Sequence, residues 1–205
     1  MFVVLYLAEG LVAFSALAFE VVAARLLAPY VGMSTDSWTA IIAAFLLAMA
    51  LGNRIGGSLA GKSDVRRMLR CSALAVAVGG LTVAVIPLLI EWCDAWILAS
   101  APSILWRSVL FTAVLCIPAG MFFGIATPLL MVSLLALAEG RGRAIGGMYA
   151  AGAAGSVAGV LAALWVLLDE LGVRASLAMI GMLSLANAIL IAAAAMRRRA
   201  HPVQA

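Results

Sequence analysis

The sequence predicts an all-α integral membrane protein with about six transmembrane helices. Of its 205 residues, 66% are hydrophobic and 11% are charged, and the mean hydropathy is +1.19, far outside the range of soluble domains. A spanning helix needs ~20 mostly apolar residues. Such stretches lie at 2–27, 38–60, 68–90, 108–138, 144–168 and 173–196. We therefore expect one transmembrane domain, 1–196, followed by a short basic cytoplasmic tail, 197–205.

The basic residues predict how the chain is oriented, because short cytoplasmic loops carry an excess of Lys and Arg. Alternate loops and the tail hold Lys62, Arg66, Arg67, Arg70, Arg141, Arg143, Arg197, Arg198 and Arg199. In the remaining loops acids outnumber bases, and the five Trp fall near the level of those loops, as expected for headgroup-level residues. We expect both termini on the cytoplasmic side of the cell (inner) membrane.

The first expected helix carries two acidic residues, Glu9 and Glu20. Acids within a membrane usually have a partner or a function, because a charge there is costly. Eleven residues apart, the two side chains lie on one side of the helix. Glu9 and Arg54 of the second helix have similar depth, so we expect an ion pair if these helices are neighbours. Alternatively, the Arg54 side chain extends alone to the inner headgroups.

The second helix ends in GGSLAGKS, residues 56–63, which matches the phosphate-binding loop pattern of nucleotide hydrolases. That loop requires a preceding strand and a following helix, whereas this stretch ends a membrane helix. Its would-be Mg-binding partner, VLLDE at 166–170, is expected on the opposite side of the membrane. The pattern therefore does not predict nucleotide hydrolysis.

Helix packing explains these glycines better, because small residues let membrane helices approach closely. The second helix has Gly52, Gly56 and Gly57, and the fifth has Gly147, Gly155 and Gly159. We expect these two helices to make the tightest contacts in the protein.

The fourth stretch, 108–138, is too long for a straight crossing, since its helix would measure about 45 Å. Its middle contains Pro118, Gly120, Gly124 and Pro128. We expect the helix to be kinked or broken there. Broken helices often form substrate sites in transporters, but an ordinary proline kink explains the pattern equally well.

Two blocks of sequence resemble a known family. The first is FEVVAARLLAPYVGMSTDSW with the glycines after it, in which Glu20, Arg25, Gly32, Ser34, Trp38, Gly52 and Gly57 match. The second contains FGIATPLL and then Gly142, Arg143, Gly147, Tyr149, Gly155 and Gly159. They resemble the membrane region of spermidine-synthase-like integral membrane proteins, described as fusions of a major-facilitator-like half with an aminopropyltransferase. The resemblance implies a half-major-facilitator-like fold.

The chain departs from that family in two respects. Gly152 and Ala153 stand where the family tends to have an Asn-Thr pair, and no Rossmann-like catalytic domain follows Met196. The resemblance thus implies that an S-adenosylmethionine-type cofactor would belong to a partner, and we expect no cofactor in this chain. The spacing of Cys71, Cys93 and Cys116 predicts no metal site, the lone His201 gives no catalytic triad, and we expect no nucleic acid partner.

Three functions remain open. The protein could dock a separate soluble aminopropyltransferase or methyltransferase through its basic loops and tail. It could instead transport a polyamine or another cation as a homodimer of six-helix halves, with the path lined by Glu9, Glu20 and the fourth helix. The third hypothesis is an enzyme with a site at the outer face, formed by Glu20, Arg25, Asp36 and Trp38. A structural role for Glu20 and Arg25, closing the turn between the first two helices, stands beside all three.

Overall fold

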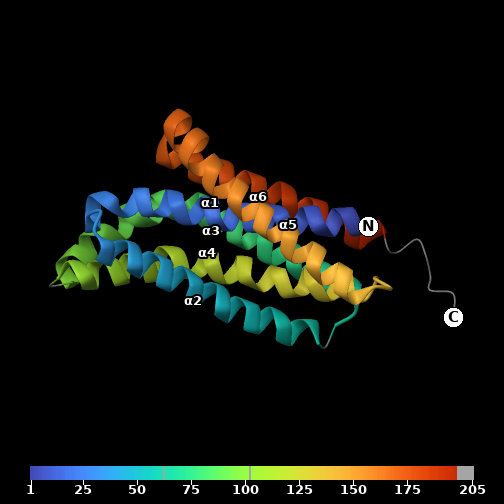
Figure 1. Cartoon of the computed structure of the whole chain (residues 1–205). Helices are drawn as coiled ribbons and strands as arrows, with labels where there is room; N and C mark the ends of the chain where they lie inside the picture. The colour runs from blue at the N-terminus through green and yellow to red at the C-terminus, as the bar shows by residue number, and fades with distance from the viewer. Residues whose placement is uncertain (62, 102, 198–205) are drawn as a thin grey trace.

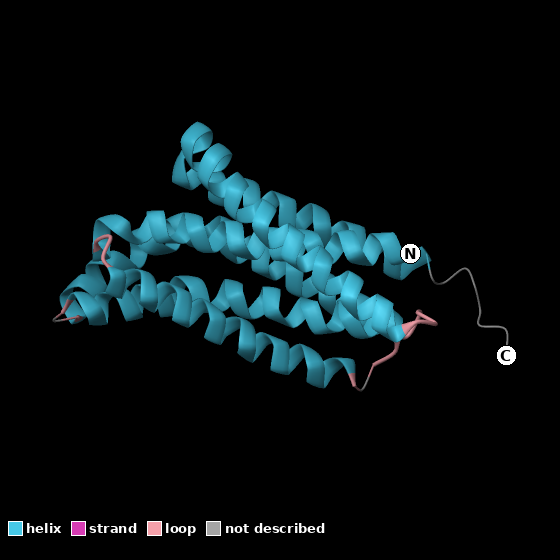
Figure 2. Ribbon diagram, in the orientation of Figure 1, coloured by secondary structure: helices cyan, strands magenta, loops and turns pink. Residues whose placement is uncertain are grey.

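The computed structural model describes residues 1–61, 63–101 and 103–197, and every regular element within these ranges is helical (Figures 1 and 2). The elements are α1 (Phe2–Val31), α2 (Thr35–Ala60), α3 (Val65–Ser100), α4 (Ile104–Leu135), α5 (Arg141–Ala162), the π-helix η1 (Ala163–Leu171) and α6 (Gly172–Arg197).

The described chain contains five helical runs that are long and apolar enough to cross a membrane. Four are α1 to α4, and the fifth is the continuous run Arg141–Arg197, which comprises α5, η1 and α6. This run turns back on itself at Gly172, where φ is 72° (Figure 1). A side chain is disfavoured at such a φ, which explains the glycine. The prediction of an all-helical fold, with apolar helices long enough to cross a membrane, is confirmed for the described residues.

Side-chain caps explain where three helices begin. Ser34 caps α2 by accepting a hydrogen bond from the Ser37 amide at 3.2 Å, and Asp64 and Ser103 cap α3 and α4 in the same way. The Ser37 hydroxyl also donates to the Val31 carbonyl at 3.0 Å. Serines therefore close the turn between α1 and α2, and within the described residues no side-chain hydrogen bond of Glu20 or Arg25 contributes to it.

The helices form an elongated bundle with two distinct ends (Figure 1). The N-terminus, the α2–α3 and α4–α5 connections and the end of α6 lie together, and we call this the terminal end. The α1–α2 and α3–α4 connections lie at the opposite, far end, whereas the turn between η1 and α6 projects away from the other helices on that side. The exposed residues Arg67, Arg70, Arg141, Arg143 and Arg197 therefore gather at the terminal end.

Glycines mediate the closest helix contacts, but α2 and α5 make them with different partners. Gly52 and Gly56 of α2 lie against the backbone of α4 at Met121 and Ile125. Gly155 and Gly159 of α5 lie against the backbone of α1 at Gly10 and Phe14. A methyl group at any of these four glycines would collide with a backbone carbonyl.

The other two predicted packing glycines have different surroundings. Gly147 lies against the Tyr6 ring, with 3.0 Å between its ideal Cβ position and the nearest ring carbon. Gly57 faces open space, with no neighbour within 4 Å of that position.

The α4 helix continues through both of its prolines. Ile104–Leu135 is described throughout and forms one 32-residue helix, so the predicted break is absent from it, and the kink stays a prediction. Gly124 is instead a packing residue, since its ideal Cβ position is 2.5 Å from the Met49 carbonyl oxygen of α2. Gly120 has the same role against Phe45 and Ala48, at 3.1 Å.

Candidate functional site

A cavity of about 490 Å³ lies among α1, α2, α4 and α5. Its polar lining residues come from all four helices and are Glu9, Asn53, Thr127, Tyr149 and Ser156. Its apolar wall includes Val12, Ala16, Leu17, Met49, Met131 and Met148. At 1.5 Å per residue, Glu9 lies about 10 Å along α1 from the terminal end. The cavity is thus within the membrane-spanning part of the bundle.

Glu9 is the charged residue among those that line this cavity. Its side chain is 6% exposed. The Thr127 side chain is a hydrogen-bond partner of the carboxyl group, but the Oε2 atom is buried without any partner. Because buried charged groups normally have an opposite charge or several hydrogen bonds, this carboxylate is only partly satisfied by the protein.

Small residues on α5 leave space in front of the carboxylate. The ideal Cβ position of Gly152 is 3.7 Å from Glu9 Oε1, and Ala153 lines the same cavity. Gly155, one turn further along α5, holds that helix against α1 at Gly10. Close helix packing therefore occurs beside a carboxylate that has only a glycine opposite it on α5.

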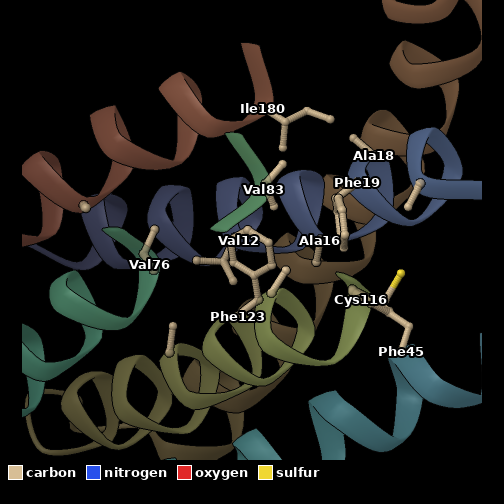
Figure 3. Close-up of a cluster of buried hydrophobic side chains, with 14 of the residues drawn as sticks. Val12, Ala16, Ala18, Phe19, Phe45, Val76, Val83, Cys116, Phe123 and Ile180 are labelled. Carbon is tan, nitrogen blue, oxygen red and sulfur yellow. The ribbon is translucent and has the colours of Figure 1, made fainter. Parts of the chain in front are cut away.

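Aromatic side chains pack between the cavity and the far end. The rings of Phe19 in α1 and Phe45 in α2 have centroids 5.9 Å apart, and both are fully buried. Figure 3 shows them in a buried cluster with Cys116, while Val12 and Ala16 lie closer to the cavity. Phe19 is about 15 Å beyond Glu9 along α1. This packing separates the cavity from the far end.

The expected ion pair between Glu9 and Arg54 is absent from the described residues, and the prediction is wrong. The two helices are not close neighbours over this region, since α2 packs mainly on α4 and α1 mainly on α5. Arg54 is exposed and lies in a shallow groove on the outside of α2, beside Leu51 and Ile55.

The residues expected to form an outer-face site do not bond to one another. Glu20 is half-buried in α1, whereas Arg25 and Asp36 are exposed. Trp38 packs its side chain against the hydrophobic core. Within the described chain, no hydrogen bond or ion pair links these four residues. Glu20 is also not among the residues that line the Glu9 cavity.

Several cavity residues were not singled out by the sequence. Asn53 is adjacent to Arg54, and a polar amide within an apolar helix was a usable signal. Thr127 lies within the quoted FGIATPLL stretch. The three methionines carried no signal, because methionine is a common filler of apolar cores.

Other predicted features are outside the cavity or outside the described residues. Lys62 of the phosphate-loop pattern and the residues 198–205, which include His201, are not described. The described part of the chain has no group of three or more His, Cys, Asp or Glu that could hold a metal ion. Comparison of the sequence with models of protein families and with curated proteins, and of the fold with solved structures, gave no match.

Proposed function

We propose that the protein is a membrane transporter that binds a small cationic solute in the Glu9 cavity. The observation that supports this function is a carboxylate that is 6% exposed, has an oxygen without a hydrogen-bond partner and lines a cavity of about 490 Å³. An intramembrane acid of this kind is typical of ion and solute pathways. A bound cation would supply the missing opposite charge.

The proposed architecture is a six-span, half-major-facilitator-like unit. In this proposal the turn at Gly172 would divide the run Arg141–Arg197 into two crossings, α5 with η1 and then α6. The exposed arginines of the terminal end favour an orientation with both termini on the cytoplasmic side of the cell (inner) membrane, by the positive-inside rule. A homodimer of such halves would enclose a transport path between two copies.

The cavity also has the asymmetry that alternating access requires. Along α1, Glu9 lies on the terminal side of Phe19, whose contact with Phe45 is closer to the far end. In the proposed cycle this aromatic contact opens when the solute moves to the far side. Transporters of this type move one helix group against another around a fixed site.

Uptake of a labelled cation into proteoliposomes tests the transport function. Glu9→Gln removes the carboxylate charge with almost no change in side-chain size. We expect this variant to show no uptake of the labelled cation. Glu20→Gln is the matched control, because it changes the other intramembrane acid of α1, which does not line the cavity. Equal loss in both variants, or no loss in Glu9→Gln, would contradict the proposed site.

A second candidate function is the docking of a soluble enzyme at the terminal end. It is favoured by the exposed Arg141 and Arg143, which line a groove of about 730 Å³ with Phe2, Tyr6 and Glu139. The family resemblance favours an aminopropyltransferase or methyltransferase as the partner. Affinity purification from native membranes, followed by mass spectrometry, tests this function. A stoichiometric transferase that is lost on replacing both arginines with Gln would support docking, and a homodimer without a partner would favour transport.

A further inference from the structure

The charge lining the cavity limits what it can bind. Glu9 supplies a single negative charge, and no other lining residue is acidic or basic. One monovalent cation neutralises it. A polyamine would bring two or more further positive charges into a wall of Met, Val, Ala and Leu, where unpaired charges are strongly disfavoured. The cavity is therefore better matched to a single positive charge.

The polar donor set does not favour a bare divalent ion. Calcium takes six to eight oxygen ligands, often from several carboxylates, and one carboxylate lines this cavity. Asn53, Thr127 and Ser156 come from three different helices. They are better placed to orient an organic ligand at separate points than to surround one ion.

The remaining wall favours an apolar ligand body. Met49, Met131 and Met148 come from three helices and contribute flexible thioether side chains, which adapt to ligands of varied shape. The volume of about 490 Å³ is in the range of pockets that hold drug-sized molecules.

An aromatic ring lies near the carboxylate. Tyr149 and Gly152 are three residues apart on α5 and so share one helix face, and both line the cavity. Gly152 is the residue that faces Glu9 Oε1. Tyr149 is 70% exposed, so much of its side chain is free to contact a ligand. Aromatic faces attract organic cations.

From these features we propose that the cavity binds lipophilic monovalent organic cations, with the cationic group at Glu9 and the apolar body against the three methionines. The inference rests on the proposed transport function, because it names the class of solute for the same site. It excludes polyamines as the preferred ligands.

Equilibrium binding of labelled tetraphenylphosphonium to the purified full-length protein in detergent micelles tests the inference without requiring transport. We expect Glu9→Gln to weaken binding about tenfold or more, the range for loss of a charge-assisted contact. Glu20→Gln should bind like the wild type. Spermidine should fail to displace the probe at concentrations where unlabelled tetraphenylphosphonium displaces it.

A second pair of variants acts at the opposite wall. Gly152→Ala places a methyl group at ordinary contact distance from Glu9 Oε1, 3.7 Å, and should bind the probe normally. Gly152→Leu covers the carboxylate and should abolish binding while the fold, followed by circular dichroism, is retained. Equal probe binding by wild type, Glu9→Gln and Gly152→Leu would overturn the inference, as would displacement by spermidine at lower concentrations than by the unlabelled probe.

The two proposals fail in different ways. Glu9-dependent binding of the probe without any uptake in proteoliposomes would contradict transport and leave the ligand class standing. Glu9-dependent uptake of spermidine, with no binding of tetraphenylphosphonium, would contradict the ligand class and leave transport standing.

Discussion

Two adjacent glycines in α2 allow a direct test of the helix packing. Gly56 and Gly57 belong to the same helix, but only Gly56 faces α4. A methyl group at Gly56 would lie 2.7 Å from Pro128 Cγ and 3.0 Å from the Ile125 carbonyl carbon. A methyl group at Gly57 would have no neighbour within 4 Å.

These distances give the size of the expected effect. Carbon atoms pack favourably at about 3.5–4.0 Å, so Gly56→Ala requires α2 and α4 to move apart locally by about 1 Å. Overpacking of this kind costs about 1–3 kcal/mol. Both substitutions gain about 1 kcal/mol of intrinsic helix propensity, and this gain cancels when the two variants are compared. We therefore expect Gly56→Ala to be less stable than Gly57→Ala by about 1–3 kcal/mol.

The assay is reversible unfolding in mixed micelles, with the denaturing detergent fraction raised stepwise and the helix content followed by circular dichroism. Gly57→Ala serves as the matched control for the loss of a glycine. If the free energies of unfolding of the two variants agree within about 0.5 kcal/mol, the usual scatter of surface substitutions, the close approach of α2 and α4 at Gly56 is refuted.

Three further predictions use the same unfolding assay. Asn187 donates a hydrogen bond to the Ala8 carbonyl at 3.0 Å. Asn187→Ala should therefore destabilise the protein by about 1 kcal/mol, the size found for hydrogen bonds between membrane helices. An unchanged free energy of unfolding would show that this hydrogen bond contributes nothing to stability. Arg174 pairs with Glu91, but their side chains are 70% and 45% exposed. Glu91→Gln should therefore change the free energy of unfolding by less than about 1 kcal/mol, and this effect should shrink in high salt. A larger, salt-independent loss of stability would contradict this reasoning. Gly172→Ala should cost about 1–3 kcal/mol, because φ 72° with ψ 174° is a backbone conformation adopted almost only by glycine; a neutral result would argue against the positive φ.

The sequence predicted well that the chain forms long apolar helices able to cross a membrane, because apolar composition and segment length determine this almost alone. It underestimated the length of α3, expected at 68–90 and observed at Val65–Ser100. The expected end excluded the stretch EWCDAW, whose charged and aromatic residues are common at the membrane surface. Nothing in that stretch stops the helix. The helix ends at Ser100, and its C-cap residue Ala101 is extended and directly precedes Pro102 in the sequence.

The proline-containing fourth helix shows a different limit of sequence analysis. Pro118 and Pro128 predicted a kink or a break, because each removes a backbone donor. The helix nevertheless continues through both, as neighbouring helices can satisfy the freed groups in a membrane. Gly120 and Gly124 were assigned to the same break, but they serve close packing with α2. Local sequence could not distinguish these roles, because the partner helix decides between them.

The two acids of α1 show why the site itself was only partly predictable. Glu9 and Glu20 lie on one side of one helix, and the periodicity that placed them there treats them as equivalent. Their neighbours on other helices make them different. Opposite Glu9, Gly152 places no side chain against the carboxylate, which lines a cavity, whereas Glu20 follows Phe19, whose ring packs against Phe45. The chemistry of an intramembrane acid is thus determined by residues distant in sequence. For that reason Glu9→Gln and Glu20→Gln should differ in their effects on cation binding and uptake.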